Sequence, residues 1–204
     1  MRHFAILAIL LLASVGSARA FDDNHLAKVK NGQGCDRCDL TNAGLAGVAL
    51  KGGNFEWSDF SKADMNGTDL SGANLERATL YKTNLAGAGL SDANLVETYL
   101  RKADLSNAKM SGAQLRLAIL RKADLRGADL RNADLSAATL TQADLTGADL
   151  RGANLTDTIT TSALFCGADL SDTRLGQTQV DVAQGDGGTK LPSGLARPGH
   201  WTGC

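Results

Sequence analysis

The sequence predicts an all-β protein built as a four-sided solenoid, a parallel β-helix. Three observations predict it. Apolar residues recur at every fifth position from Leu40 to Val180, a compact residue lies two positions before each of them, and a second repeat of 20 residues is superimposed on the first. Repetition this regular indicates a solenoid, in which each unit buries its apolar side chains against its neighbours. Only Thr160 interrupts the apolar series.

A period of five residues is compatible with neither an α-helix nor a single β-strand. Five residues advance an α-helix by about 500°, so successive leucines would spiral around the whole helix surface. In a strand they would alternate between the two faces, because five is an odd number. A chain that turns a corner after every five residues can instead direct each apolar residue and its compact neighbour inward.

A second period of 20 residues indicates how many corners complete one coil. Lysines recur at this spacing, and so does a series of glycines that is interrupted only by Asn107. Four pentapeptides per coil would align each series in a column, and Gly and Asn suit corners that need a positive φ. The lysine column is Lys62, Lys82, Lys102 and Lys122, and the glycine column is Gly47, Gly67, Gly87, Gly127, Gly147 and Gly167.

The five-residue units resemble those of the pentapeptide-repeat family. Segments such as ADLRG, ADLSN, ANLTD and ADLTG match that family's unit, in which a small residue is followed by Asp or Asn, by Leu and by two variable residues. The resemblance extends from Cys38 to Val180. It implies a right-handed quadrilateral parallel β-helix (a pentapeptide-repeat solenoid) of about seven coils.

The first 20 residues have the layout of a secretory signal peptide. Arg2 and His3 precede an apolar run from Phe4 to Ala13, and Ala18-Arg19-Ala20 provides a small-x-small cleavage pattern. A transmembrane anchor is disfavoured because the run is shorter than the ~20 residues that span a bilayer. We therefore expect an exported protein in the periplasm, the thylakoid lumen or the extracellular space, with no transmembrane segment after cleavage.

Both ends of the solenoid should be capped. Before the repeats, Asp22 or Asp23 can begin a short helix that carries Leu26 and Val29. After them, the Gly and Pro content predicts an irregular tail. Its apolar residues, Leu191, Leu195 and Trp201, could cover the last coil. The expected segments are a signal peptide at 1–20, an N-terminal cap at 21–37, the β-helix at 38–180 and a C-terminal capping tail at 181–204.

The four cysteines lie in two pairs at opposite ends of the repeats. Cys35 and Cys38 have C-x-x-C spacing, which is compatible with a structural disulfide, with free or exchanging thiols, or with a metal site to which only His25 could add a nearby ligand. Cys166 follows an inward position, so a bond to Cys204 would pin the tail beside the last coil. We expect two intrachain disulfides, no metal and no cofactor.

The sequence argues against an enzyme. Outside the leader the histidines are His25 and His200, which belong to opposite ends, so no Ser-His-Asp or Cys-His arrangement can be assembled from them. The many Asp residues that directly precede leucines are interpreted as polar, outward members of the repeat. No catalytic residue is therefore predicted.

One outward group of basic residues is a candidate binding face. The lysine column lies beside Arg101 and Arg121 and within reach of Tyr81. One interpretation is a solvated face of mixed charge. The other is a site for an anionic partner, such as a glycan, a lipid headgroup or an acidic protein.

A small group of outward apolar residues is a second candidate. Val96, Tyr99, Leu117 and Ile119 fall near one corner at positions that should face solvent. Such a patch can mark an interface, and it can also be drift of the repeat.

The function predicted best is a non-catalytic, exported scaffold that acts as a structural or protein-interaction module. Its expected partner is an unknown protein or an anionic component of the cell envelope, and the chain should be a monomer or a weak homodimer. Thiol–disulfide exchange at Cys35 and Cys38 is one alternative. The family resemblance implies another, a DNA mimic that interacts with DNA gyrase. Export and a basic column disfavour that alternative, and no nucleic-acid partner is expected.

Overall fold

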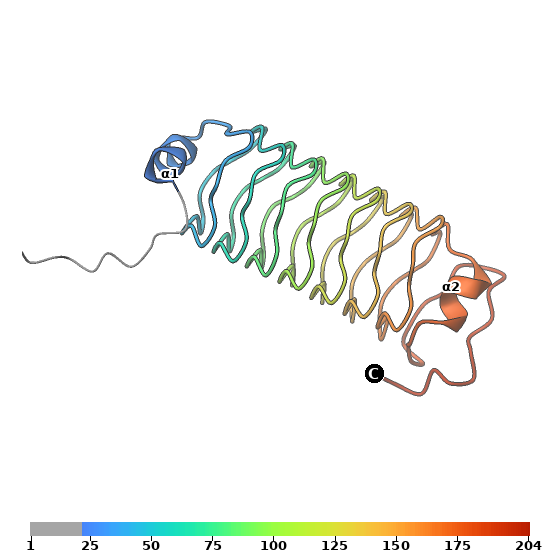
Figure 1. Cartoon of the computed structure of the whole chain (residues 1–204). Helices are drawn as coiled ribbons and strands as arrows, with labels where there is room; N and C mark the ends of the chain where they lie inside the picture. Colours follow the sequence, from blue (N-terminus) through green and yellow to red (C-terminus); the bar gives the residue numbers. More distant parts are fainter. Residues whose placement is uncertain (1–21) are drawn as a thin grey trace, which may run out of the picture.

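Between two short helices, the chain forms an elongated stack of coils (Figure 1). The computed structural model describes residues 22–204, with α1 (Asp23–Lys30) at the first end and α2 (Gln177–Asp181) at the last. Isolated parallel bridges join residues 20 positions apart, from Asp39 with Asp59 to Asn154 with Arg174. Each side of a coil contributes one bridge, so the described residues form a parallel β-helix in which no strand is longer than a bridge.

Every bridge rests on backbone hydrogen bonds to the neighbouring coils. On one side, the N–H of Leu125 donates to the carbonyl of Asp144 with an N···O distance of 2.7 Å, and the N–H of Asp144 donates to Ala123 at 3.0 Å. The corner is closed by the N–H of Ala128, which donates to the carbonyl of Leu125 at 3.0 Å. Gly127 within this corner has φ +66°, a backbone conformation that glycine adopts without strain.

The predicted apolar series fills the interior. Leu125 and its equivalents from Leu40 to Leu155 are buried. Thr160, which interrupts the series, is also buried, and its hydroxyl donates to the carbonyl of Gln179 at 2.7 Å. Buried hydroxyl groups must find such partners, and one hydrogen bond explains how the repeat tolerates a polar residue at an inward position.

Helix α1 begins where the sequence predicts a short capping helix. The carboxylate of Asp22 accepts a hydrogen bond from the N–H of Asn24 at 2.8 Å and thereby caps the first turn. Val29 is fully buried and Leu26 packs against the core, so the apolar side of the helix covers the first coil.

His25 completes the edge of the first coil. The N–H of Asp59 donates to the carbonyl of Cys38 in the preceding coil at 2.8 Å. The equivalent N–H of Asp39 has no preceding coil, and it donates to Nδ1 of His25 at 3.3 Å instead. This side chain therefore supplies an acceptor that the repeat itself cannot provide.

The end of the repeats differs from the prediction. Val180 is buried as expected, but the backbone from Gln177 to Asp181 forms helix α2 rather than another corner of the five-residue repeat. No complete coil follows this point to pair with the chain. The side-chain amide of Gln179 instead donates to the carbonyls of Leu155 at 2.7 Å and Thr158 at 2.9 Å, which ties α2 to the preceding coil.

The first part of the tail is more regular than its composition predicted, whereas residues 191–204 are irregular as expected. Gln184 bridges to Leu164 and Lys190 bridges to Asp169, so the chain continues along two further sides of the solenoid. The hydroxyl of Thr189 donates to the carbonyl of Phe165 at 2.8 Å, as threonines do between earlier coils. This segment pairs with the open edge of the last coil. Amino-acid composition alone does not reveal such a long-range contact.

The tail also seals the interior at that end. Trp201 is 6 % exposed, and its Nε1 donates to the carbonyl of Ala183 at 3.0 Å. The indole ring lies directly on Gly185, where a Cβ would overlap the ring. Leu191 and Leu195 are partly buried against the core, as expected for residues that cover the last coil.

Neither described helix has the length and apolarity needed to cross a membrane. The predicted signal peptide lies outside the described residues.

Candidate interaction face and cysteine sites

One side of the solenoid differs in composition from the other three. We name it the Tyr–Ile face and define it by five outward residues that are linked in sequence by parallel bridges, Thr79, Tyr99, Ile119, Thr139 and Ile159. Most of the equivalent residues on the other three sides are Asp or Asn. The face therefore replaces a polar ladder with β-branched and aromatic side chains.

This replacement removes a recurrent hydrogen bond. On the other sides the Asp or Asn carboxyl or amide oxygen accepts the N–H two residues later, as Asp104 does from Ser106 at 3.0 Å and Asp124 from Arg126 at 3.1 Å. Tyr99 and Ile119 cannot accept such a bond. Each bond of this kind contributes about 1 kcal/mol to stability, so the face gives up local turn stabilisation for apolar surface.

The residues of the predicted apolar patch lie on this face and at the corner before it. Ile119 is 39 % exposed and Leu117, at the adjoining corner, is 41 % exposed. Tyr99 and Val96 are partly buried. Sequence reasoning missed Ile159, which is 51 % exposed and continues the same column. Its 20-residue spacing from Thr139 was the signal that could have identified it.

The lysine column lies at the corner that follows the face. Its members are exposed and their φ values lie between 57° and 60°. The N–H of Lys82 donates to the carbonyl of Arg101 at 3.1 Å, and that of Lys102 donates to Arg121 at 3.1 Å. The structure thus stacks the predicted lysines, both arginines and Tyr81 along one edge of the Tyr–Ile face. We call Lys62, Lys82, Arg101, Lys102, Arg121 and Lys122 the basic edge.

On two other sides of the solenoid, arginines are neutralised by neighbouring aspartates, as Arg126 is by Asp124. Arg131 contacts Asp129 at 2.7 Å and Arg151 contacts Asp149 at 2.6 Å. The guanidinium of Arg131 lowers the pKa of the Asp129 carboxyl by donating a hydrogen bond to it. These pairs leave little net charge on their sides of the molecule.

The basic edge has no comparable neutralisation. Among the residues that the structure describes, none of its six side chains has an acidic oxygen within ion-pair distance. The ammonium nitrogen of Lys82 lies 5.4 Å from the centre of the Tyr81 ring, and the Tyr81 and Tyr99 ring centres are 6.3 Å apart. Nε of Arg101 is buried and has no hydrogen-bond partner among the described residues.

A further aromatic group on the corner before the face was not predicted. Trp57 is 48 % exposed and lies between two guanidinium groups, with Arg77 at 5.1 Å and Arg37 at 5.9 Å from its ring. Arg77 also pairs with Glu97 at 2.8 Å. This corner therefore carries balanced charges, in contrast to the basic edge.

The cysteines pair at the two ends as the sequence suggested. Cys35 is joined to Cys38 with a Cα–Cα distance of 5.7 Å, and Cys166 to Cys204 with a distance of 6.0 Å. Cys166 points away from the interior, as expected, yet it is only 6 % exposed. Its disulfide partner at the end of the tail lies over it, so this bond holds the cap against the repeats.

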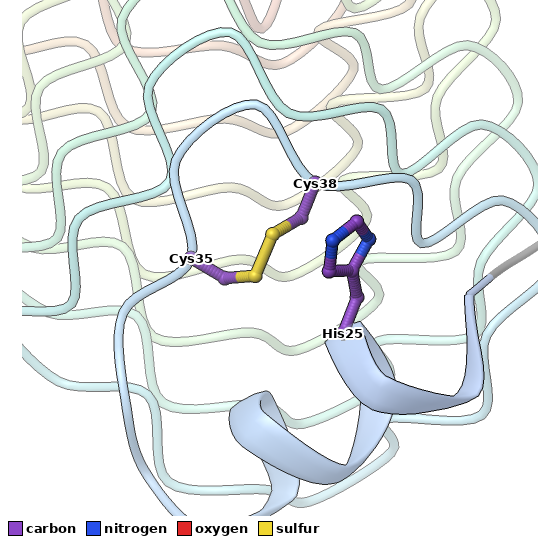
Figure 2. A group of neighbouring side chains, drawn as sticks. All are labelled: His25, Cys35 and Cys38. Atoms are coloured by element: carbon purple, nitrogen blue, oxygen red, sulfur yellow. A yellow bond between two sulfur atoms is a disulfide. The ribbon is translucent and has the colours of Figure 1, made fainter.

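Figure 2 shows His25 beside the first disulfide. The candidate ligand atoms of His25, Cys35 and Cys38 lie within 4.8 Å of one another. In the disulfide neither sulfur is a thiolate, and Nδ1 of His25 already accepts from Asp39. The other ring nitrogen, Nε2, lies 3.9 Å from a carboxylate oxygen of Asp22. The arrangement fits a structural disulfide better than a metal site.

Comparison with known proteins agrees with the repeat. A sequence model described as pentapeptide repeats matches eight copies over residues 38–77, 83–121, 118–157 and 148–181. None of the curated proteins matches the chain.

Solved structures of similar proteins include three with different biological settings. QnrB1, a plasmid-mediated fluoroquinolone resistance protein, is 20 % identical over 79 % of this chain and 92 % of its own, with a TM-score of 0.46. HetL from Nostoc, which is involved in regulating heterocyst differentiation, is 28 % identical over 85 % and 90 %, with a TM-score of 0.28. A thylakoid-lumen protein of Arabidopsis thaliana is 27 % identical over 77 % and 81 %, with a TM-score of 0.29. On the evidence of the matched repeats, this chain belongs to the pentapeptide-repeat family.

Proposed function

We propose that the protein is a non-catalytic, exported scaffold that binds an anionic partner of the cell envelope through its Tyr–Ile face and basic edge. The observation that carries this proposal is the unneutralised basic edge beside exposed apolar residues. Four arginines elsewhere, Arg77, Arg126, Arg131 and Arg151, are paired with carboxylates of the same chain. Charge concentrated at one edge of a chain whose formal net charge is −1 favours a dedicated binding surface.

The proposed location rests on the leader and on the cysteines. Residues 1–20 have the pattern of a signal peptide, and disulfides are stable in exported compartments. The cysteine pairing supports export because it uses all four thiols of the chain.

The experiment measures retention of residues 22–204 on the isolated envelope fraction of the exporting cell. This segment holds both caps and all described coils. Salt-sensitive retention that falls when Lys102 and Lys122 are both changed to Gln is expected. Equal retention of the variant and the unaltered protein would remove the basic edge from the proposal.

Thiol–disulfide exchange remains a second candidate because His25 lies beside the Cys35–Cys38 bond. Burial opposes it, since Cys35 is 1 % and Cys38 5 % exposed and an attacking thiolate needs access to a sulfur. An insulin-reduction assay separates the two functions. The scaffold predicts no turnover above the rate of the double Cys35→Ser, Cys38→Ser variant.

A further inference from the structure

We infer that the anionic partner is a lipid bilayer, and that the Tyr–Ile face lies flat on a membrane surface rich in anionic phospholipids. This inference rests on the proposed function and specifies its partner. It combines three observations about the face, which are its charge, its apolar centre and its shape.

The charge is dense and regular. Parallel pairing stacks Lys82, Lys102 and Lys122 on successive coils, and adjacent coils of such a sheet lie about 4.8 Å apart. The six cations of the basic edge therefore occupy a row about 15 Å long. A protein partner would need a matching row of carboxylates in fixed register. A fluid anionic bilayer supplies mobile headgroups that need no register.

The apolar centre suits the boundary between headgroups and acyl chains. Ile119 is exposed on the face and Leu117 at the corner before it, and the ring of Tyr99 on the face lies next to that of Tyr81 on the basic edge. Aliphatic side chains can insert below the headgroups while tyrosines and lysines remain at their level. Leu117 keeps this exposure although its φ is +62°, a conformation that favours Gly or Asn.

The shape is that of one side of a stack of coils rather than a groove. Figure 1 shows the coils following one another in a straight row. The surface hollow lined by Arg131, Arg151 and Asp172 lies at a different corner. A protein interface gains most from anchors that fill pockets, whereas a bilayer requires only a flat side with aligned cations.

The test uses residues 22–204, so that the apolar leader cannot bind lipid itself. Co-sedimentation is measured with vesicles of phosphatidylcholine alone and with vesicles that contain an equal part of phosphatidylglycerol. Binding to the anionic vesicles, weakened by added salt, is expected. The double variant Lys102→Gln, Lys122→Gln should bind about 25-fold more weakly, since each cation near an anionic surface contributes about fivefold.

Two further variants make the result specific to this face. Lys51→Gln combined with Lys109→Gln removes the same charge from exposed positions on other sides and should bind within twofold of the unaltered protein. Ile119→Thr introduces the residue found at positions 79 and 139 of the same column, so it should fold. It should weaken binding about fourfold for each buried methylene that is lost.

The outcomes separate the lipid from other partners. Absence of binding to anionic vesicles, or equal weakening by both lysine pairs, would overturn the lipid inference. Envelope retention that is lost after protease treatment of the envelope, without any vesicle binding, would identify an acidic protein as the partner. In that case the proposed scaffold function would survive and the lipid inference would not.

Discussion

At the scale of single residues, the inward and outward positions of one pentapeptide should respond very differently to substitution. Leu125 is fully buried, so Leu125→Asp places a carboxylate in an apolar interior where no cation can pair with it. We expect this variant not to fold. Arg126, the next residue, has a 59 % exposed side chain that pairs with Asp124.

The matched control is therefore Arg126→Ala. Exposed ion pairs contribute about 0–1 kcal/mol, which corresponds to a melting-temperature change below about 4 °C for a domain of this size. Thermal unfolding followed by circular dichroism measures both variants. Similar melting temperatures would show that the inward and outward assignment is wrong.

Asp169 should make stability depend on pH in the acid range. Hydrogen bonds from Ser171 and then from Lys190 lower the pKa of its carboxyl from 3.8 to about 2. A carboxyl whose pKa is lower in the folded state stabilises the fold above its unfolded pKa. That contribution disappears as the pH falls from about 4 through about 2.

Asp169→Asn tests this sign. The variant should melt below the unaltered protein at neutral pH, and the two melting temperatures should converge as the solution is acidified below about pH 2. A difference that stays constant over the whole acid range would mean that the carboxylate charge does not stabilise the tail.

At the scale of elements, local sequence predicted the first cap better than the last. Asp22 and the apolar Leu26 and Val29 form a local helix signal, and the helix occurs there. The path of the tail depends instead on contacts made at long range, such as the pairing of Gln184 with Leu164. Composition reports the flexibility of the isolated segment and contains no information about the open coil edge that orders it.

The two disulfides should contribute unequally to stability. Cys166 and Cys204 are 38 residues apart in sequence, whereas Cys35 and Cys38 are three apart. In the chain-entropy model the long loop contributes about 4 kcal/mol and the short one about 2 kcal/mol. Replacing both cysteines of the C-terminal pair by serine should therefore lower the melting temperature more than replacing the N-terminal pair.

Peptide mapping without reduction must accompany this comparison, to establish that each remaining pair is intact. An equal or smaller effect of the C-terminal pair would indicate that Trp201 and the backbone bridges already hold the tail without the covalent bond.

At the scale of the whole molecule, the sequence predicted the architecture because its two periods are independent of any single residue. Every inward position needs a side chain that can be buried. An exception at Thr160, or an unexpected path of the tail, therefore does not change the predicted architecture of the other coils. The surface is less predictable. Lys102 and Lys122 could be aligned from their spacing, but the absence of acidic partners around them depends on side-chain positions that only the folded chain specifies.

The repeat also allows the residues of the face and of the basic edge to be moved to different sides of the solenoid without removing any charged residue. Ser111–Leu115 is one uncharged pentapeptide. Deleting it preserves the inward series but rotates all later residues by a quarter turn relative to earlier ones. Tyr99 and Lys102 then lie on a different side from Ile119 and Lys122. Deleting Ser136–Leu140, another uncharged pentapeptide, leaves the basic edge aligned.

Both deletion variants lose one repeat unit and should have similar melting temperatures, because the interior of each remains continuous. The deletion of 111–115 should weaken binding to anionic vesicles by about 25-fold, since Arg121 and Lys122 leave the common edge, each contributes about fivefold, and the Arg126 that replaces Arg121 is neutralised by Asp124. The deletion of 136–140 keeps all six cations aligned and should weaken binding much less. The measurement is co-sedimentation of the two variants at equal salt. Equal binding would mean that affinity follows the amino-acid composition rather than the alignment of the coils, because the two variants have the same charged residues.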